Sequence, residues 1–138
     1  MPGRKVVVGR TEYIALPGLK VRRVEAKIDT GAFRSALHYH GVKTRTEGGR
    51  KWLVVTFRMG RQRTTVRFRT FKRVTVKSST GEQTRRWLIT TAVRLNGHRV
   101  RTQFTLFDRS DMKYQVLLGR KFLRGRFLVD VSKKRLLG

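Results

Sequence analysis

Short apolar stretches separated by turn residues run along the whole chain, and almost none is long enough for a helix of ordinary length. In one of them Val66 and Phe68 alternate with Arg67 and Arg69, which is the period of a strand with one buried face. The pattern predicts strands over residues 6–9, 11–16, 24–28, 42–46, 52–57, 64–71, 74–76, 87–93 and 100–107. We therefore expect an all-β domain that is closed or nearly closed into a barrel.

Helical signal is confined to two short segments. One helical turn is expected near 120–124, where Arg120 to Leu123 precede Gly125, and 35–38 is a weaker second candidate. Neither segment is long enough to form a helical layer packed against the strands.

Turn residues divide the strands into hairpins. Gly48-Gly49, Met59-Gly60 and Asn96-Gly97 each separate two predicted strands. The Asn-Gly pair is the strongest of these signals, because both central positions of a type I′ turn need a positive φ. No low-complexity linker or long repeat interrupts the 138 residues, so residues 1–138 are predicted to form a single domain.

The charge of the chain is extreme. Its 34 Lys and Arg residues against 8 Asp and Glu residues give a formal net charge of +26, which favours polyanionic partners. The chain has no cysteine and no apolar run long enough to span a bilayer, so a cytoplasmic protein without a membrane partner is expected. The residues expected to bind acidic ligands are Arg61, Arg63, Arg67, Arg69, Arg85 and Arg86.

One segment points to catalysis. Asp29 follows an apolar strand and begins the turn Asp29-Thr30-Gly31-Ala32, which is how an aspartic peptidase presents its acid. Such an enzyme needs two carboxylates that share one proton, so that one acts as base toward a water and the other as acid. The turn therefore supplies half of a catalytic pair.

A second segment extends the pattern. Val116 to Leu123 is an apolar strand that contains Leu117-Leu118-Gly119 and continues into Arg120. An Asp-Thr-Gly turn followed late in the chain by an apolar-apolar-Gly strand resembles the retropepsins, the retroviral-type aspartic peptidases. The order of strands, hairpins and short helix matches as well.

Nearly the whole chain is similar to a bacterial retropepsin-like family whose older name is ATP-dependent zinc proteases. Members of that family are often associated with ligases that add glutamate to a ribosomal protein. The segments that carry the similarity include Val8 to Glu12, Ala26 to Ala32, Ser35 to His38, Val76 to Glu82, Phe104 to Leu106, Asp108 to Met112, Leu117 to Arg120 and Gly125 to Asp130.

The resemblance implies an aspartic endopeptidase that acts on a peptide or protein substrate, which the charge predicts to be acidic and the ligase association suggests is glutamate-extended. It implies Asp29 as the catalytic residue, and Thr30, Gly31 and Ala32 as its turn. Ser78, Ser79, Thr80 and Gly81 correspond to the tip of a flap, and Leu117, Leu118, Gly119 and Arg120 to the segment that supports the site. With one Asp turn per chain, the enzyme is predicted to be a homodimer, with residues 6–8 and 127–131 as candidate interface strands.

Two other functions remain open from the sequence. A basic β-barrel with an inactive Asp turn would bind RNA or the ribosome through phosphate contacts. A zinc peptidase would use His38 and His40, with His98 as a third imidazole, but no His-Glu-x-x-His helix accompanies them and no phosphate-binding loop is present. Asp108 and Asp111 are expected to form a charged turn, and no metal or other cofactor is expected.

Overall fold

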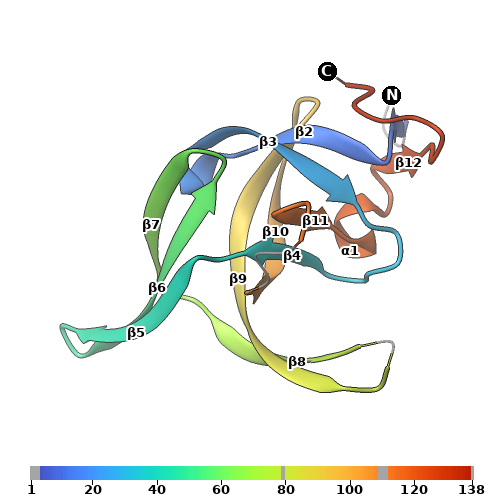
Figure 1. Ribbon diagram of the computed structural model, residues 1–138. Helices are drawn as coiled ribbons and strands as arrows, with labels where there is room; N and C mark the ends of the chain where they lie inside the picture. The colour runs from blue at the N-terminus through green and yellow to red at the C-terminus, as the bar shows by residue number, and fades with distance from the viewer. Residues whose placement is uncertain (1–3, 79, 109–111, 138) are drawn as a thin grey trace.

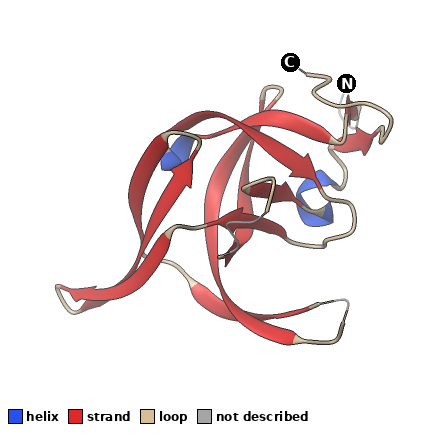
Figure 2. Cartoon of the chain, viewed as in Figure 1, coloured by secondary structure: helices blue, strands red, loops and turns tan. Residues whose placement is uncertain are grey.

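The computed structural model describes residues 4–78, 80–108 and 112–137. The strands are β1 (Val6–Val8), β2 (Thr11–Leu16), β3 (Val21–Ile28), β4 (Ser35–His38), β5 (Gly41–Glu47), β6 (Arg50–Met59), β7 (Gln62–Phe68), β8 (Lys72–Lys77), β9 (Gln83–Leu95), β10 (His98–Phe107), β11 (Val116–Leu118) and β12 (Phe127–Val129). A 3-10 turn, η1, covers Pro17–Leu19, and the α-helix α1 covers Arg120–Leu123. Figures 1 and 2 show a fold built almost wholly from strands.

Six strands close into a hydrogen-bonded ring. The largest sheet has the order β10-β4-β11-β3-β2-β9-β8, and a further pairing of β9 with β10 closes the first six of these strands into a ring. Strand β8 lies outside the ring and pairs only with β9 in that sheet, so β8 and the first half of β9 form a hairpin that projects from the body (Figure 1). The expectation of an all-β, nearly closed fold is confirmed.

The segment between β4 and β8 forms a separate three-stranded sheet, β5-β6-β7. Its central strand β6 contributes Leu53, Val55 and Phe57, each 0% exposed, to the same apolar core that the ring encloses. The extra strands therefore pack onto the ring through one shared core.

The Asn96-Gly97 turn was predicted correctly. Both residues have positive φ, 48° and 79°, and they connect β9 to β10 in register, with His98 opposite Leu95. The backbone twist of a type I′ turn matches the right-handed twist of two paired strands. An Asn-Gly pair between two strands is therefore a strong predictor of a hairpin.

The weak helix prediction over 35–38 was wrong. Those residues form β4, which pairs in parallel with β10 and antiparallel with β11. A strand between two partners gains backbone hydrogen bonds on both edges and buries Ala36 and Leu37, whereas four residues would form only a single helical turn. The helix near 120–124 is present as α1.

A buried carboxylate fastens the two ends of the chain together. Glu12 is 0% exposed and accepts hydrogen bonds from the backbone N–H groups of Gly9 (2.7 Å), Leu136 (3.0 Å) and Leu137 (3.0 Å). Next to this contact, β1 and β12 pair in parallel, and both ends of the chain lie beside them in Figure 1. Among the described residues, no helix has the length and apolar character needed to cross a membrane.

Candidate active site

Asp29 lies in a turn that its own backbone holds in place. The turn begins where β3 ends, and the Asp29 N–H donates to the carbonyl oxygen of Leu118 at 2.8 Å. The Oδ1 atom accepts a hydrogen bond from the N–H of Gly31 at 3.2 Å, and the Ala32 N–H donates to the Asp29 carbonyl at 3.3 Å. The carboxylate is therefore oriented within the turn and remains only half-buried.

The second apolar-apolar-Gly segment packs directly against this turn. Strand β11 pairs in parallel with β3, with Leu118 opposite Ile28. Beyond it, the backbone N–H groups of Arg120 and Lys121 donate to the carbonyls of Ala32 and Phe33 at 2.8 and 2.9 Å. The structure thus brings together the two segments that the sequence singled out.

Gly119 is required where these segments meet. A Cβ atom at this position would lie 2.6 Å from the carbonyl oxygen of Arg34, which is closer than real Cβ contacts allow. Its N–H donates to the hydroxyl of the buried Ser35 at 3.0 Å. The glycine lets the chain pass close behind the Asp29 turn.

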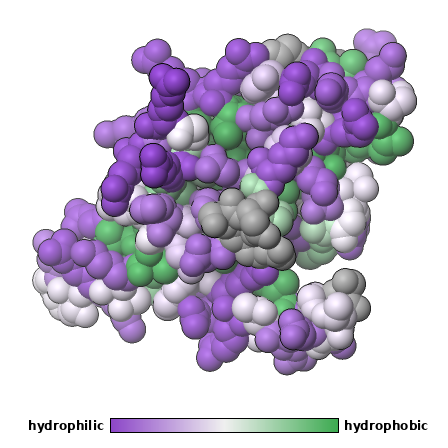
Figure 3. Space-filling view, in the orientation of Figure 1, coloured by the Kyte–Doolittle hydropathy of each residue, from purple (hydrophilic) through white to green (hydrophobic). Residues whose placement is uncertain are grey.

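A cavity of about 410 Å³ separates the Asp29 turn from the projecting hairpin. On one side it is lined by Gly31, Ala32, Phe33, Arg34, Ala36, Thr105 and Leu117. On the other side it is lined by Thr75, Val76, Lys77 and Arg86 of β8 and β9. Figure 3 shows a notch between the hairpin and the rest of the molecule, on a face that is mostly hydrophilic.

The hairpin tip has its own hydrogen bonds. The Ser78 hydroxyl lies 2.8 Å from the Thr80 hydroxyl, the Gly81 N–H donates to the Ser78 carbonyl at 3.0 Å, and Gly81 has a φ of 88°. Ser79, the remaining residue expected at a flap tip, lies outside the described residues. The hairpin that carries this tip forms one side of the cavity at the Asp29 turn.

A second cavity, of about 430 Å³, continues under the hairpin and shares Arg86 with the first. Its lining includes Arg73 and Arg85, together with the acidic Glu82 and Asp108. The exposed Asp108 was expected in a charged turn with Asp111, which lies outside the described residues.

The predicted acid-binding arginines divide into two groups. Arg85 and Arg86 lie on β9 and line the cavities under the hairpin. Arg63 and Arg67 lie on β7, and Arg61 and Arg69 flank that strand. Arg67 forms an ion pair with Glu47 at 3.0 Å, and both Arg67 and Arg69 lie over the Trp52 ring, with centroid distances of 4.7 and 6.0 Å. None of this second group lines the cavity at the Asp29 turn.

Two cationic residues at the cavity were missed by the sequence reasoning. Arg34 follows the Asp29 turn, and Lys77 ends β8 just before the hairpin tip. Their place in the sequence could have identified them, because each lies next to a segment already assigned to the site. Net charge alone gave no way to separate them from the other basic residues.

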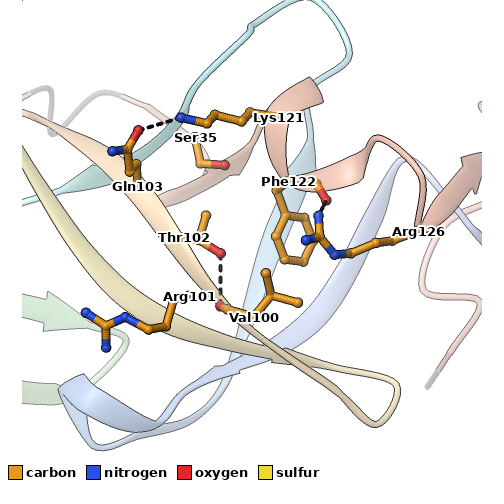
Figure 4. Close-up of a pocket in the computed structure, with 8 residues that line it drawn as sticks. All are labelled: Ser35, Val100, Arg101, Thr102, Gln103, Lys121, Phe122 and Arg126. Carbon is orange, nitrogen blue, oxygen red and sulfur yellow. Dashed lines mark hydrogen bonds between the residues drawn. The ribbon is translucent and has the colours of Figure 1, made fainter.

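Figure 4 shows another cavity, of about 280 Å³, between β10 and α1. Lys121 donates to Gln103 there at 2.7 Å, and Arg126 donates to the Phe122 carbonyl at 2.9 Å. It shares no lining residue with the cavity at the Asp29 turn. These two hydrogen bonds already engage two of the cations that line the cavity.

The histidines do not converge. His38 ends β4 and contacts the Phe107 ring, with centroids 5.6 Å apart, while His98 contacts the Phe127 ring at 5.4 Å. His40 is exposed beyond the end of β4. In the described part of the chain, no group of three or more His, Cys, Asp or Glu residues is arranged to hold a metal ion.

The comparisons with known proteins agree with this arrangement of strands and turn. A crystal structure of a Legionella pneumophila protein of unknown function (DUF785) superposes with a TM-score of 0.80 at 19% identity, over 98% of this chain and 100% of that one. At this identity the likeness establishes the fold. The fold is that of a β-domain in which an Asp turn and an apolar-apolar-Gly strand meet beneath a projecting hairpin.

The sequence comparison identifies the family. A model of the RimB-like family, described as the retropepsin-like aspartic endopeptidase RimB, matches residues 7–137. The chain belongs to this family of aspartic endopeptidases, which are hydrolases.

Longer relatives contain a similar segment. A probable alpha-L-glutamate ligase from Shewanella halifaxensis is 30% identical over 142 residues, which are 100% of this chain and 31% of the relative. A probable alpha-L-glutamate ligase from Desulfotalea psychrophila is 31% identical over 140 residues, 97% of this chain and 30% of the relative. The chain thus spans about a third of the length of these curated relatives.

Proposed function

We propose that two copies of this chain form one active site, in which the Asp29 carboxylates share a proton and activate a water for peptide hydrolysis. One carboxylate removes a proton from the water while the other donates a proton to the carbonyl oxygen of the peptide. Thr30, Gly31 and Ala32 hold the carboxylate in its turn, and the hairpin that ends at Ser78 to Gly81 covers the bound peptide. Residues 1–138 act as a single domain, since β6 of the extra sheet shares one core with the ring.

The exposed position of the turn is the observation that carries this proposal. Thr30 and Gly31 of the turn are both exposed. The two other described Asp residues serve different contacts: Asp108 lies under the hairpin, and Asp130 accepts hydrogen bonds from the N–H and hydroxyl of Ser132. A half-site at the surface is completed most simply by the same half-site of a second copy, related by a two-fold axis.

The surface beside the chain termini offers apolar area for such a dimer. Val7 on β1 lies opposite Leu128 on β12, and they are 46% and 52% exposed. Val131, two residues after β12, is 68% exposed. Apolar contacts between these residues of two copies would offset part of the repulsion between two chains of +26 charge.

An acidic substrate fits the charge of the cleft. Lys77, Arg86 and Arg34 line the cavity that begins at the Asp29 turn, and the neighbouring cavity adds Arg73 and Arg85 together with the acidic Glu82 and Asp108. The relatives named as glutamate ligases suggest a substrate that carries added glutamate residues. We therefore propose glutamate-rich protein segments as the substrate class.

The competing proposal, an RNA- or ribosome-binding module, receives less support. Base stacking needs open aromatic faces, and the Trp52 ring of the basic β5–β7 sheet is covered by Arg67 and Arg69. The basic surface of that sheet remains a candidate for association with phosphate backbones.

The experiment compares Asp29→Asn with the matched variant Asp108→Asn on a glutamate-rich peptide. Asp29→Asn should lower kcat/KM by about 10³-fold or more, because it removes the acid–base group while keeping the shape of the side chain. Asp108→Asn should cleave at close to the wild-type rate. Wild-type activity in Asp29→Asn, with both variants folded, would overturn the proposal.

A further inference from the structure

Arg34 has a buried donor that no group in the described structure satisfies. Its Nε atom is inaccessible to solvent and has no hydrogen-bond partner. An unsatisfied buried N–H costs about 1–3 kcal/mol, more when the group is charged. No ligand can reach the buried Nε in this conformation, but Arg34 also lines the cavity beside the Asp29 turn, where an anionic ligand would contact the rest of its side chain.

Contacts with Gly119 and the pairing of the next strand hold the backbone at Arg34 in a rigid position. The carbonyl oxygen of Arg34 lies against Gly119, and the next residue, Ser35, accepts a hydrogen bond from the Gly119 N–H at 3.0 Å. Ser35 also begins β4, which is paired on both edges. A side chain on a rigid backbone discriminates between ligands better than a side chain on a flexible loop does.

The cavity around Arg34 is cationic and contains no counter-charge. Lys77 and Arg86 reach the same space from β8 and β9, and no Asp or Glu is among its lining residues. Within the described ranges, neither of these two cations forms an ion pair. The three positive charges therefore face a cavity that an anionic group would neutralise.

Most of the remaining wall of the cavity is apolar, and Thr75 and Thr105 are its polar members. Ala32, Phe33 and Ala36 lie on the side of the Asp29 turn, and Val76 lies on the hairpin. A ligand that suits both parts has a short hydrocarbon stem and a planar anionic end. The side chain of glutamate has this form, and a carboxylate can accept two hydrogen bonds from one guanidinium.

We propose that Arg34 determines specificity by binding the side-chain carboxylate of a glutamate residue of the substrate beside the Asp29 turn. Lys77 and Arg86 add long-range attraction from the hairpin, so the hairpin is drawn toward the turn when an acidic residue occupies the cavity. This inference rests on the proposed peptidase function and assigns its selectivity to a residue outside the catalytic turn.

The test measures kcat/KM on a series of peptides in which each glutamate of a glutamate-rich substrate is replaced in turn by glutamine. Glutamine keeps the shape of the side chain and removes its charge. For the wild-type enzyme, replacement at one position should lower kcat/KM by about 10- to 100-fold, since a charged hydrogen-bonded pair is lost. In Arg34→Met that preference should disappear, and the preferences at the other positions should remain.

Two further variants make the result specific. Arg34→Lys keeps the charge without the planar guanidinium and should show an intermediate preference. Arg45→Met removes an exposed arginine from β5, which does not line the cavity, and should leave the whole profile unchanged. If Arg34→Met does not fold, as judged by thermal unfolding, the Arg34→Lys profile decides the question.

The outcomes separate this inference from the function on which it rests. An unchanged glutamate preference in the folded Arg34 variants would overturn the role of Arg34 while leaving the peptidase intact. If the wild-type protein cleaves none of the peptides, or Asp29→Asn cleaves them as well as wild type, the proposed function itself fails.

Discussion

The guanidinium of Arg120 donates a hydrogen bond from Nη1 to the carbonyl oxygen of Thr30 at 3.0 Å, across 90 residues of sequence. The backbone N–H of Arg120 also donates to the carbonyl of Ala32 at 2.8 Å. One residue at the start of α1 therefore holds two carbonyl groups of the turn that carries Asp29. Its contacts link the supporting segment to the position of the proposed catalytic carboxylate.

Removal of the Arg120 side chain should impair catalysis more than stability. Arg120→Met is expected to lower kcat by about 10-fold or more, since small displacements of a catalytic group have large effects on rate, while KM changes little. Arg120 is exposed, so the unfolding temperature should shift by only a few degrees. Arg124→Met, an exposed arginine four residues further on, is the matched control and should retain activity. Equal losses in both variants would contradict a positioning role for Arg120.

Leu128→Lys should weaken the dimer without unfolding the subunit. The Leu128 side chain is 52% exposed, so its replacement removes little core packing but places a further positive charge on the proposed interface. Activity should be lost at low protein concentration and partly recovered at high concentration, as mass action requires. Sedimentation measures the state of association. Thr44→Lys, at an exposed position of β5, should behave as wild type, and an unchanged dimer in Leu128→Lys would place the interface elsewhere.

Glu12 should be a major contributor to stability. Its carboxylate is 0% exposed and accepts hydrogen bonds from three backbone N–H groups, which Glu12→Ala would leave buried without an acceptor. We expect a loss of about 3 kcal/mol in the free energy of unfolding, measured by urea denaturation. The control Glu47→Ala removes a surface ion pair with Arg67 and should cost at most about 1 kcal/mol. Similar losses in the two variants would show that Glu12 does not hold the C-terminal segment.

Because of the contact between Glu25 and Arg135, the free energy of unfolding should decrease as the pH falls in the acid range. The hydrogen bond from Arg135 to the Glu25 carboxylate, at 2.8 Å, holds the pKa of Glu25 below its ordinary value of 4.5, partly opposed by burial of the carboxylate. A lowered pKa means that the folded state binds the proton less tightly than the unfolded state does. The stabilisation is therefore complete above pH 4.5 and is lost as the pH falls through the lower, folded pKa.

Glu25→Gln isolates this contribution. The variant should be less stable than wild type at pH 7, and the difference between them should shrink as the pH is lowered below 4.5. Urea unfolding at several pH values measures it. A difference that stays constant with pH would show that the effect of the substitution does not come from the ionised carboxylate.

Features with local causes could be predicted from the sequence. The Asn96-Gly97 turn follows from the positive φ that both positions require, and the alternation of Val66 and Phe68 with arginines follows from the one partly buried face of β7. The Asp29 turn and the strand before it were recognisable for the same reason. These signals need only neighbouring residues.

Features that depend on distant residues could not be predicted. Residues 35–38 form a strand because β10 and β11 lie on either side, and the chain locally gives no sign of either partner. Glu12 finds its hydrogen-bond donors in Leu136 and Leu137, more than 120 residues away. Arg34 could not be distinguished from the other arginines until the fold placed it in the wall of the cavity at the Asp29 turn.

The most direct test of the shared site is the activity of mixed dimers. Wild-type and Asp29→Asn subunits are mixed under conditions that allow exchange, with the total protein concentration held constant, and peptide cleavage is measured against the wild-type fraction. If each site needs Asp29 from both copies, activity follows the square of that fraction, and an equal mixture retains about a quarter of the wild-type activity. An equal mixture that retains half, as dilution with buffer would give, would contradict a site made from two Asp29 carboxylates.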